Sequence, residues 1–269
     1  MHAPHNSPPA QTTPLPASTN AVSIEVCVDS VAGLATCQGH ADRIELCSAL
    51  SLGGLTPTPG LIARATDSVV PVYAMIRPEA GGFDLLPDQV DLMCCEIRSI
   101  RAAGLAGVVI GATQHDSQGQ CHLDRSALAR MCDAAGPLDI TLHRAIDLTC
   151  DPLAALEIAI ELGIGRILSS GGAVRATDGA ARLAAMQRHA AGQITLMAGG
   201  GVTPDTLPAL AAATGITAFH ASCSRATPTA RDLYAMGFAP QTQARTDAGM
   251  IDALRAAAIT ACRPTRAPV

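Results

Sequence analysis

Short apolar runs alternate with longer amphipathic stretches from about residue 22 to residue 262 of the 269-residue chain. The short runs are rich in Val, Ile and Leu, which is typical of strands buried on both faces. The longer stretches have apolar residues at helical spacing, and one begins at Thr58-Pro59, a typical N-cap and first-turn pair. This alternation predicts strands that pair in parallel, because crossover connections between such strands are right-handed.

Eight strands and eight helices can be placed in strict alternation along the sequence. We expect strands at 23–28, 43–47, 70–76, 107–111, 138–143, 166–169, 193–197 and 216–221. We expect helices at 30–40, from 58 onward, and at 87–103, 124–135, 152–163, 176–190, 203–215 and 246–262, with a hairpin or long loop at 113–122 and a loop from 222 to about 245.

Eight such units predict an α/β fold of the closed TIM (β/α)8 barrel type, with parallel strands and a single domain at residues 21–262. The alternative is a doubly wound open sheet. That fold usually has a glycine-rich dinucleotide turn after its first strand, and here Asp29-Ser30 follows that strand. Residues 1–20 are rich in Pro, Ala, Thr and Ser and are expected to be a disordered tail, and residues 263–269 a short C-terminal tail.

The composition narrows the class of protein. No Trp, two Tyr and three Phe leave Ala, Val, Leu and Ile to build the core, and a net charge of -5 without a basic stripe argues against nucleic acid as a partner. The chain has no apolar segment long enough to cross a membrane and no secretory signal pattern. Its ten cysteines lack the spacing of a disulfide scaffold, so we expect a cytoplasmic protein with reduced thiols.

Two strands near the start of the chain repeat one pattern, a glutamate followed two residues later by a cysteine. They hold Glu25 with Cys27 and Glu45 with Cys47. Side chains two residues apart on a strand point to the same face, so each pair faces the barrel interior if its glutamate does. Since a buried carboxylate is costly unless it is paired or used, the repeated pattern indicates a site.

Further polar residues follow the other strands at the end where barrel active sites lie. With the two glutamates they are Arg77, His143, Arg144, Asp147, Ser169, Ser170, His220 and Ser222. Each alone can be explained as a satisfied structural group, but their recurrence on many strands favours a site. Gly171-Gly172 and Gly199-Gly200-Gly201 follow two strands, where they either form tight turns or let backbone amides approach an anion.

Two chemistries suit these residues. Cys27 and Cys47, on neighbouring strands, can offer two thiolates to a soft ion such as Cu(I), although free cysteine is also a common buried hydrophobe. An enzyme site would instead use Glu25 or Glu45 as general base or acid, and His143 or His220 as its proton-transfer partner. Arg77 or Arg144 would then clamp a small anionic or sugar-like substrate. A hard-metal site of Glu, His and Asp is a third possibility, and no organic cofactor is expected.

Several motifs, in this order along the chain, resemble the CutC family of copper homeostasis proteins. The resemblance spans about residues 22–225 and rests on residues 25–30, 41–47, 53–57, 76–78, 141–147, 169–171 and 198–202. It implies a TIM barrel, a cytosolic location, self-association into a homo-oligomer, and Cu(I) binding at Cys27 and Cys47. The family usually has Arg-Gly-Gly-Asp-Phe after Ile-Arg-Pro, whereas here Glu79-Ala80 replaces that arginine and Phe83-Asp84 reverses the last pair.

Overall fold

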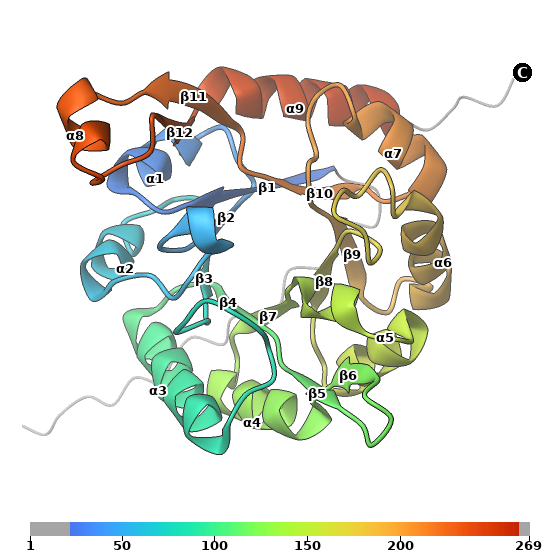
Figure 1. The fold of residues 1–269 in the computed structure, drawn as a ribbon. Coiled ribbons are helices and arrows are strands. Elements are labelled where there is room, and N and C mark those ends of the chain that lie inside the picture. Colours follow the sequence, from blue (N-terminus) through green and yellow to red (C-terminus); the bar gives the residue numbers. More distant parts are fainter. Residues whose placement is uncertain (1–21, 264–269) are drawn as a thin grey trace, which may run out of the picture.

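In the computed structural model, which describes residues 22–263, eight parallel strands close into a barrel ringed by helices (Figure 1). The strand order around the barrel is β1-β10-β9-β8-β7-β4-β3-β2, so the first strand pairs with the last. The strands are β1 (Ser23–Val28), β2 (Arg43–Leu46), β3 (Val72–Met75), β4 (Gly107–Ile110), β7 (Asp139–Leu142), β8 (Arg166–Ser169), β9 (Thr195–Ala198) and β10 (Ala218–Ala221). The predicted TIM barrel is confirmed.

Helices fill the connections between consecutive barrel strands and cover the outside of the barrel. Their bounds are α1 (Val31–Cys37), α2 (Pro59–Ala65), α3 (Pro87–Ala103), α4 (Arg125–Ala135), α5 (Pro152–Glu161), α6 (Ala180–Ala190), α7 (Leu207–Thr214) and α9 (Ala248–Ala261). Side-chain oxygens cap several of their first turns, including those of Ser30, Thr58, Asp124, Asp151 and Asp247. These side-chain oxygens accept hydrogen bonds from backbone N–H groups that have no partner within the helix.

Two helices begin later than the sequence suggested. The helix expected from Thr203 begins at Leu207, because Thr203 and Thr206 exchange side-chain hydrogen bonds in a turn and Pro208 occupies the first helical turn. The helix expected from residue 176 begins at Ala180, after Gly179. A Cβ on Gly179 would lie 1.9 Å from the carbonyl oxygen of Ser170, so the chain passes too closely here for any other residue.

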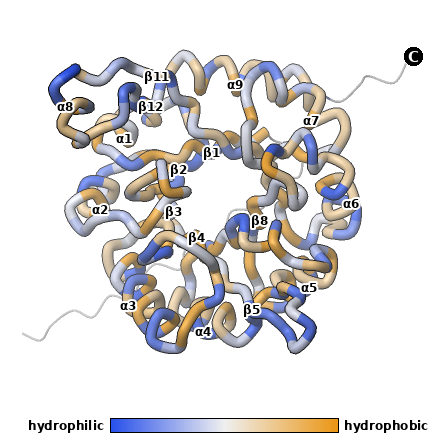
Figure 2. Tube along the Cα trace, in the orientation of Figure 1, coloured by the Kyte–Doolittle hydropathy of each residue, from blue (hydrophilic) through white to orange (hydrophobic). Residues whose placement is uncertain are grey.

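Two antiparallel hairpins interrupt the alternation. β5 (Thr113–His115) and β6 (Cys121–Leu123) form the hairpin that was one of the two structures expected after β4, and much of it is hydrophilic (Figure 2). The segment expected as a loop after β10 is instead a second hairpin, β11 (Ser224–Pro228) and β12 (Thr242–Thr246), with the short helix α8 (Arg231–Ala235) at its tip. Short 3-10 turns also occur at Leu50–Leu52 and Arg144–Leu148.

The apolar core lies mainly between the strands and the helices. In β1, Ile24, Val26 and Val28 face that layer, while the alternate side chains of the strand face the barrel interior. Inside the barrel the apolar clusters are small, and one contains Cys47, Tyr73, Met75 and Val109. The barrel interior therefore has room for charged groups, and these lead to the site. The expected tails, residues 1–20 and 263–269, lie outside the described residues apart from Arg263.

Candidate functional site

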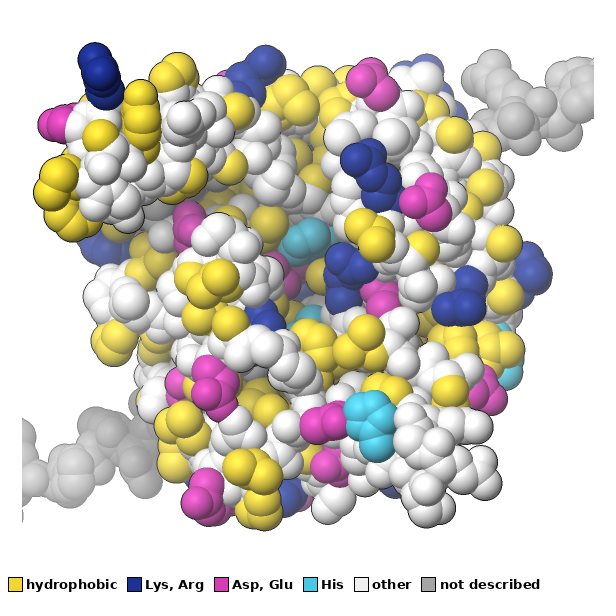
Figure 3. Space-filling view, in the orientation of Figure 1, with side chains coloured by type: hydrophobic (Ala, Val, Ile, Leu, Met, Phe, Trp, Pro, Cys, Tyr) yellow, Lys and Arg dark blue, Asp and Glu magenta, His cyan; other side chains and the backbone are white. Residues whose placement is uncertain are grey.

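A cavity of about 400 Å³ opens at the carboxyl ends of the barrel strands, where this fold places active sites. Figure 3 shows this face hollowed at its centre, with histidine and basic side chains inside the hollow. The residues expected from the sequence divide into two sets. Those that line the cavity are Cys27, Glu45, Arg77, His143, Arg144, Gly200, His220 and Ser222. Those that do not line it are Glu25, Cys47, Asp147, Ser169, Gly171 and Gly199.

Three side chains converge on one wall of the cavity. Strand pairing sets Cys27 beside Glu45 and brings β10, with His220, against β1. One ligand atom each from Cys27, Glu45 and His220 lie within 4.8 Å of one another, in the one group of three or more potential metal ligands among residues 22–263. His220 Nε2 is 3.8 Å from Glu45 Oε2, too far for a hydrogen bond. The group is therefore compact.

Glu25 lies one inward position below this group and is fully buried. Its Oε2 accepts a hydrogen bond from Arg43 Nε at 2.9 Å, and its Oε1 lies 2.9 Å from His220 Nδ1. Burial raises the pKa of the Glu25 carboxyl, but the bonds and charges of His220 and Arg43 outweigh burial and bring this pKa to about 2. Glu25 is therefore ionised, and it orients His220 from below.

His220 lies between two carboxyl groups. Burial lowers its pKa, but Glu45, Cys27 and Glu25 raise it well above its ordinary value of 6.5. With Glu25 ionised at one ring nitrogen, the imidazolium form of His220 is favoured at neutral pH. Any ion that binds Nε2 must therefore displace a proton.

Glu45 is the less satisfied of the two carboxyl groups. Its Oε1 is buried without a hydrogen-bond partner among the described residues, and Cys47 Sγ lies 3.6 Å from its Oε2. Burial raises the pKa of Glu45, and the pKa of the Cys47 thiol also lies well above its ordinary value because of burial and the neighbouring carboxylate. Cys47 is enclosed, since a Cβ on Gly54 would lie 2.9 Å from its sulfur.

Asp147 fills the glycine loop after β8 that the sequence suggested as an anion site. Its carboxylate accepts hydrogen bonds from Ser169 Oγ at 2.6 Å, Ser170 N at 3.0 Å and Gly172 N at 3.0 Å. Arg144 Nε also donates to it at 2.9 Å. Burial raises the pKa of Asp147, but these hydrogen bonds lower it below its ordinary value. The protein's own carboxylate thus takes the place that an external anion would have occupied.

The remaining loop residues either pack closely or border the cavity. Gly199 serves close packing, because a Cβ there would lie 2.5 Å from Leu168 Cδ1. Gly171 N donates to Ser169 Oγ at 2.9 Å. Gly200 borders the cavity, and so does Ser222, whose hydroxyl lies 3.0 Å from that of Ser224.

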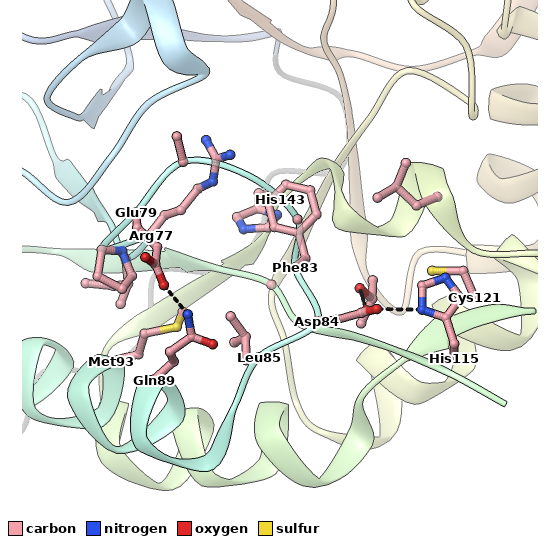
Figure 4. Close-up of a pocket in the computed structure, with 17 residues that line it drawn as sticks. Arg77, Glu79, Phe83, Asp84, Leu85, Gln89, Met93, His115, Cys121 and His143 are labelled. Carbon is pink, nitrogen blue, oxygen red and sulfur yellow. Dashed lines mark hydrogen bonds and ion pairs between the residues drawn. The ribbon is translucent and has the colours of Figure 1, made fainter. Parts of the chain in front are cut away.

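Arg77, Phe83 and His143 form the opposite wall. Phe83 stacks beside His143 with 4.7 Å between ring centroids, and Arg77 Cζ lies 5.2 Å from the Phe83 ring centroid. Behind them is a second cavity of about 410 Å³, bordered by Asp84, His115 and other residues (Figure 4). Burial, then the charge of Arg77, lowers the pKa of His143 to about 4, so its ring is neutral at pH 7.

The comparisons with known proteins agree with this architecture. The model of the CutC family matches residues 22–225. The chain belongs to the CutC family. The CutC family protein of Rhizobium meliloti (strain 1021) is 49% identical over 238 residues, which cover 87% of this chain and 95% of that protein. The human copper homeostasis protein cutC homolog is 39% identical over 207 residues, 76% of this chain and 74% of that protein.

Solved structures give the same result. The CutC protein of Streptococcus agalactiae has a TM-score of 0.69 and 26% identity, covering 75% of this chain and 98% of that chain. Phosphoribosyl anthranilate isomerase from Thermococcus kodakaraensis, at 14% identity and a TM-score of 0.52, covers 88% of this chain and 98% of its own, and shows the fold alone. The chain is thus a CutC copper homeostasis family member, and the resemblance found in the sequence is confirmed. Most of the second hairpin lies beyond the matched range.

Sequence reasoning missed one charged residue of this CutC site, Arg43. Its guanidinium bonds Glu25, contacts Asp139 at 3.2 Å and Thr141 at 3.2 Å, and lies 3.3 Å from the Tyr73 ring centroid. The signal was present in the sequence, because Arg43 precedes Glu45 by two residues and so shares its inward face. Among the described residues, no helix is both long and apolar enough to cross a membrane.

Proposed function

We propose that this CutC family member binds copper as Cu(I), with Cys27 as the common ligand of the site. The observation that carries the proposal is the compact group of Cys27, Glu45 and His220. Thiolate sulfur and imidazole nitrogen are donors that suit Cu(I), whereas carboxylate oxygen suits harder ions. Glu45 would therefore supply negative charge beside the ion, and copper is the cargo of the protein rather than a resident cofactor.

The second ligand has two candidates. The sequence and the family resemblance favour Cys47, and the geometry favours His220, which belongs to the compact group. Cys47 stays a candidate because its sulfur lies 3.6 Å from Glu45 Oε2 and so lies close to the same carboxylate. Binding to either residue must release a proton, since the pKa of each lies well above its ordinary value.

Competition with a chromogenic Cu(I) chelator under anaerobic conditions tests the site. Cys27→Ser should weaken Cu(I) binding by orders of magnitude, and so should the double variant Cys27→Ser/Cys47→Ser. Comparing Cys47→Ser with His220→Gln identifies the second ligand. Glu45→Gln should leave the affinity almost intact, and Cys95→Ser, at an exposed position on α3, is the matched control. Undiminished affinity in the double serine variant would refute the site.

A second candidate function is an acid–base enzyme that acts on a small anionic or sugar-like substrate. One observation favours it: Glu45 Oε1 and His143 Nε2 are buried polar atoms with no described partner, on two residues that line the same cavity. Native proteins satisfy nearly all buried polar groups, and exceptions concentrate where chemistry occurs. Glu45 would act as general base or acid, with His143 or His220 in proton transfer. Glu25, which lies behind His220, would act through it.

Turnover in a metabolite screen tests the enzyme. Glu45→Gln keeps the shape of the side chain and removes its charge, so it should abolish turnover of any substrate that the screen finds. Glu96→Gln is the matched control, because Glu96 lies outside the cavity and bonds Thr56. Equal turnover in Glu45→Gln and wild type would exclude the acid–base role.

Two further proposals concern the setting of the protein. All ten cysteines are free thiols, which supports a reducing cytoplasmic location, to be tested by fractionation of cells. Self-association into a homo-oligomer is proposed from the family, and light scattering of the purified protein at several concentrations would test it. Each ligand of the proposed copper site comes from one chain, so the site does not depend on that outcome.

A further inference from the structure

Three side chains separate the two cavities of the molecule. Arg77, Phe83 and His143 border both the cavity at the barrel mouth, of about 400 Å³, and the one behind it, of about 410 Å³. Figure 4 shows the three side chains in the lining of the second cavity. The wall between the cavities therefore consists of one aromatic ring, one imidazole and one guanidinium group. The polar side-chain atoms of this wall belong to Arg77 and His143, and the hydrogen bonds that these atoms already make show what the wall can bind.

His143 presents a hydrogen-bond donor toward this wall. The backbone N–H of Ala145 donates to His143 Nδ1 at 3.1 Å, so Nδ1 is the acceptor of the neutral ring and the hydrogen is on Nε2. The side chain of His143 is buried, with the residue 4% exposed, and Nε2 has no partner among the described residues. A buried N–H without an acceptor destabilises the folded protein, so this atom requires an explanation.

Arg77 has a second such donor. Nη1 donates to the carbonyl oxygens of Leu52 at 2.9 Å and Gly54 at 3.2 Å, and Nη2 donates to that of Gly81 at 2.9 Å. These bonds fix the plane of the guanidinium. The remaining nitrogen, Nε, is buried and has no described partner. The terminal groups of Arg77 thus hold the surrounding loops, while its Nε–H is unused.

We propose that the Nε–H of Arg77 and the Nε2–H of His143 bind a small organic carboxylate beneath Phe83. This inference rests on the second candidate function, whose substrate class it names. A carboxylate offers two planar oxygens to two N–H donors and balances the single charge of Arg77. A phosphate dianion fits less well, since Glu45 borders one cavity and Glu79 and Asp84 border the other.

Phe83 packs beside both side chains that carry the donors, so in this proposal it moves to let a ligand reach them. Its ring contacts His143 and lies under Arg77, and both nitrogen atoms are closed to solvent. Phe83 follows Gly81 and Gly82 in an exposed loop, and Gly81 has a φ of 120°, a conformation that glycine adopts readily. Rotation of this loop would open the wall and join the two cavities.

Nuclear magnetic resonance of the histidine side chains in the full-length protein tests the subsite. Pyruvate, inorganic phosphate and acetamide serve as the probes. Pyruvate should shift the Nε2 resonance of His143 in a saturable way, while phosphate and acetamide should not. Arg77→Lys keeps the charge and loses the Nε–H. It should weaken the affinity for pyruvate at least about 10-fold, because a hydrogen bond to a charged group is lost. Phe83→Leu should bind pyruvate faster, and His189→Gln, on the surface, should behave as wild type.

The outcomes separate this inference from the enzyme proposal. Three results would each overturn the subsite. The first is that pyruvate causes no saturable shift of the His143 resonance, and the second is that phosphate causes this shift instead. The third is that Arg77→Lys and His143→Phe bind pyruvate as tightly as wild type does. Because the wild-type resonance is itself a readout, the test holds even if a variant fails to fold. Turnover that depends on Glu45 without a His143 shift would leave the enzyme standing without the subsite. Pyruvate binding at His143 without any turnover would support the subsite and contradict the enzyme proposal.

Discussion

Asp147 and Glu45 are two carboxyl groups on opposite sides of the barrel mouth, and their surroundings differ sharply. Asp147 accepts hydrogen bonds from two serines, two backbone N–H groups and Arg144, and its pKa is lowered. Glu45 has one hydrogen-bond contact, to the Cys47 thiol, and an ion pair with His220 at 3.8 Å, and burial raises its pKa. The residue type is similar, and the number of donors around each carboxylate makes the difference.

The comparison separates structural from reactive groups. A carboxylate with all its oxygens occupied stabilises the loop that it holds and has little capacity for a ligand. A carboxylate with an unpartnered buried oxygen costs free energy in the folded protein, and such groups concentrate at functional sites. By this criterion we propose that the β2 side of the mouth, with Glu45, is the functional side and that the β8 side, with Asp147, is its scaffold.

The largest effect should come from Asp147→Asn. The amide would direct an NH₂ group at surrounding donors and leave Arg144 without its charged partner. We expect the free energy of unfolding to fall by roughly 3 kcal/mol, as for other buried charged hydrogen-bond networks. Urea denaturation followed by circular dichroism measures it. Asp178→Asn, at an exposed residue of the same loop, is the control, and a similar loss in both variants would contradict the special role of Asp147.

Acid should act on the two carboxyl groups with opposite signs. Asp147 has a folded pKa below its ordinary 3.8, so its stabilisation is complete above that value and is lost as the pH falls through the folded pKa. Glu45 has a folded pKa above its ordinary 4.5, so the folded state takes up its proton first and gains stability as the pH falls through that pKa.

Urea titrations from pH 7 to pH 3 would show these signs in the variants. The stability gap between wild type and Asp147→Asn should begin to narrow below about pH 4, where the unfolded chain binds a proton that the folded Asp147 does not yet bind. Any advantage of Glu45→Gln at pH 7 should disappear as wild-type Glu45 becomes protonated. Parallel curves for all three proteins would show that neither carboxyl group has a shifted pKa.

The smallest effect should come from Glu45→Gln itself. The variant removes a buried charge that has no full set of donors, but it also removes the attraction to His220, 3.8 Å away. These terms oppose each other, so we expect the free energy of unfolding to change by less than about 1 kcal/mol. The measurement is the same denaturation. A loss comparable to that of Asp147→Asn would mean that Glu45 is part of the scaffold.

Much of this site follows from strand periodicity. The two-residue repeat put Glu25 with Cys27, and Glu45 with Cys47, on the inner face of the barrel, and the buried contacts among these residues confirm that orientation. The depth of each side chain within the barrel could not be predicted from this repeat. Glu25 lies beneath the cavity because Cys27, not Glu25, pairs with Glu45 across the strands, and this stagger is a property of barrel closure that no single strand encodes.

Other features depended on contacts between distant segments. That Asp147 occupies the glycine loop after β8 follows from the 3-10 turn at Arg144–Leu148, which is not evident from residue spacing. The β11–β12 hairpin was missed because its strands are mostly polar and face solvent on both sides, so they lack the alternation that identifies a half-buried strand.

The bond between Glu25 and His220 joins residues 195 positions apart, and it forms only when the last barrel strand pairs with the first. Contacts of such long range carry a large loop-closure cost and form late in folding. During synthesis β1 and β2 emerge early, yet their Glu25, Cys27 and Glu45 lack His220 until β10 has left the ribosome. The completed group of Cys27, Glu45 and His220 is therefore also a marker of a closed barrel, and a truncated product lacking β10 would have Cys27 and Glu45 without the histidine that accompanies them.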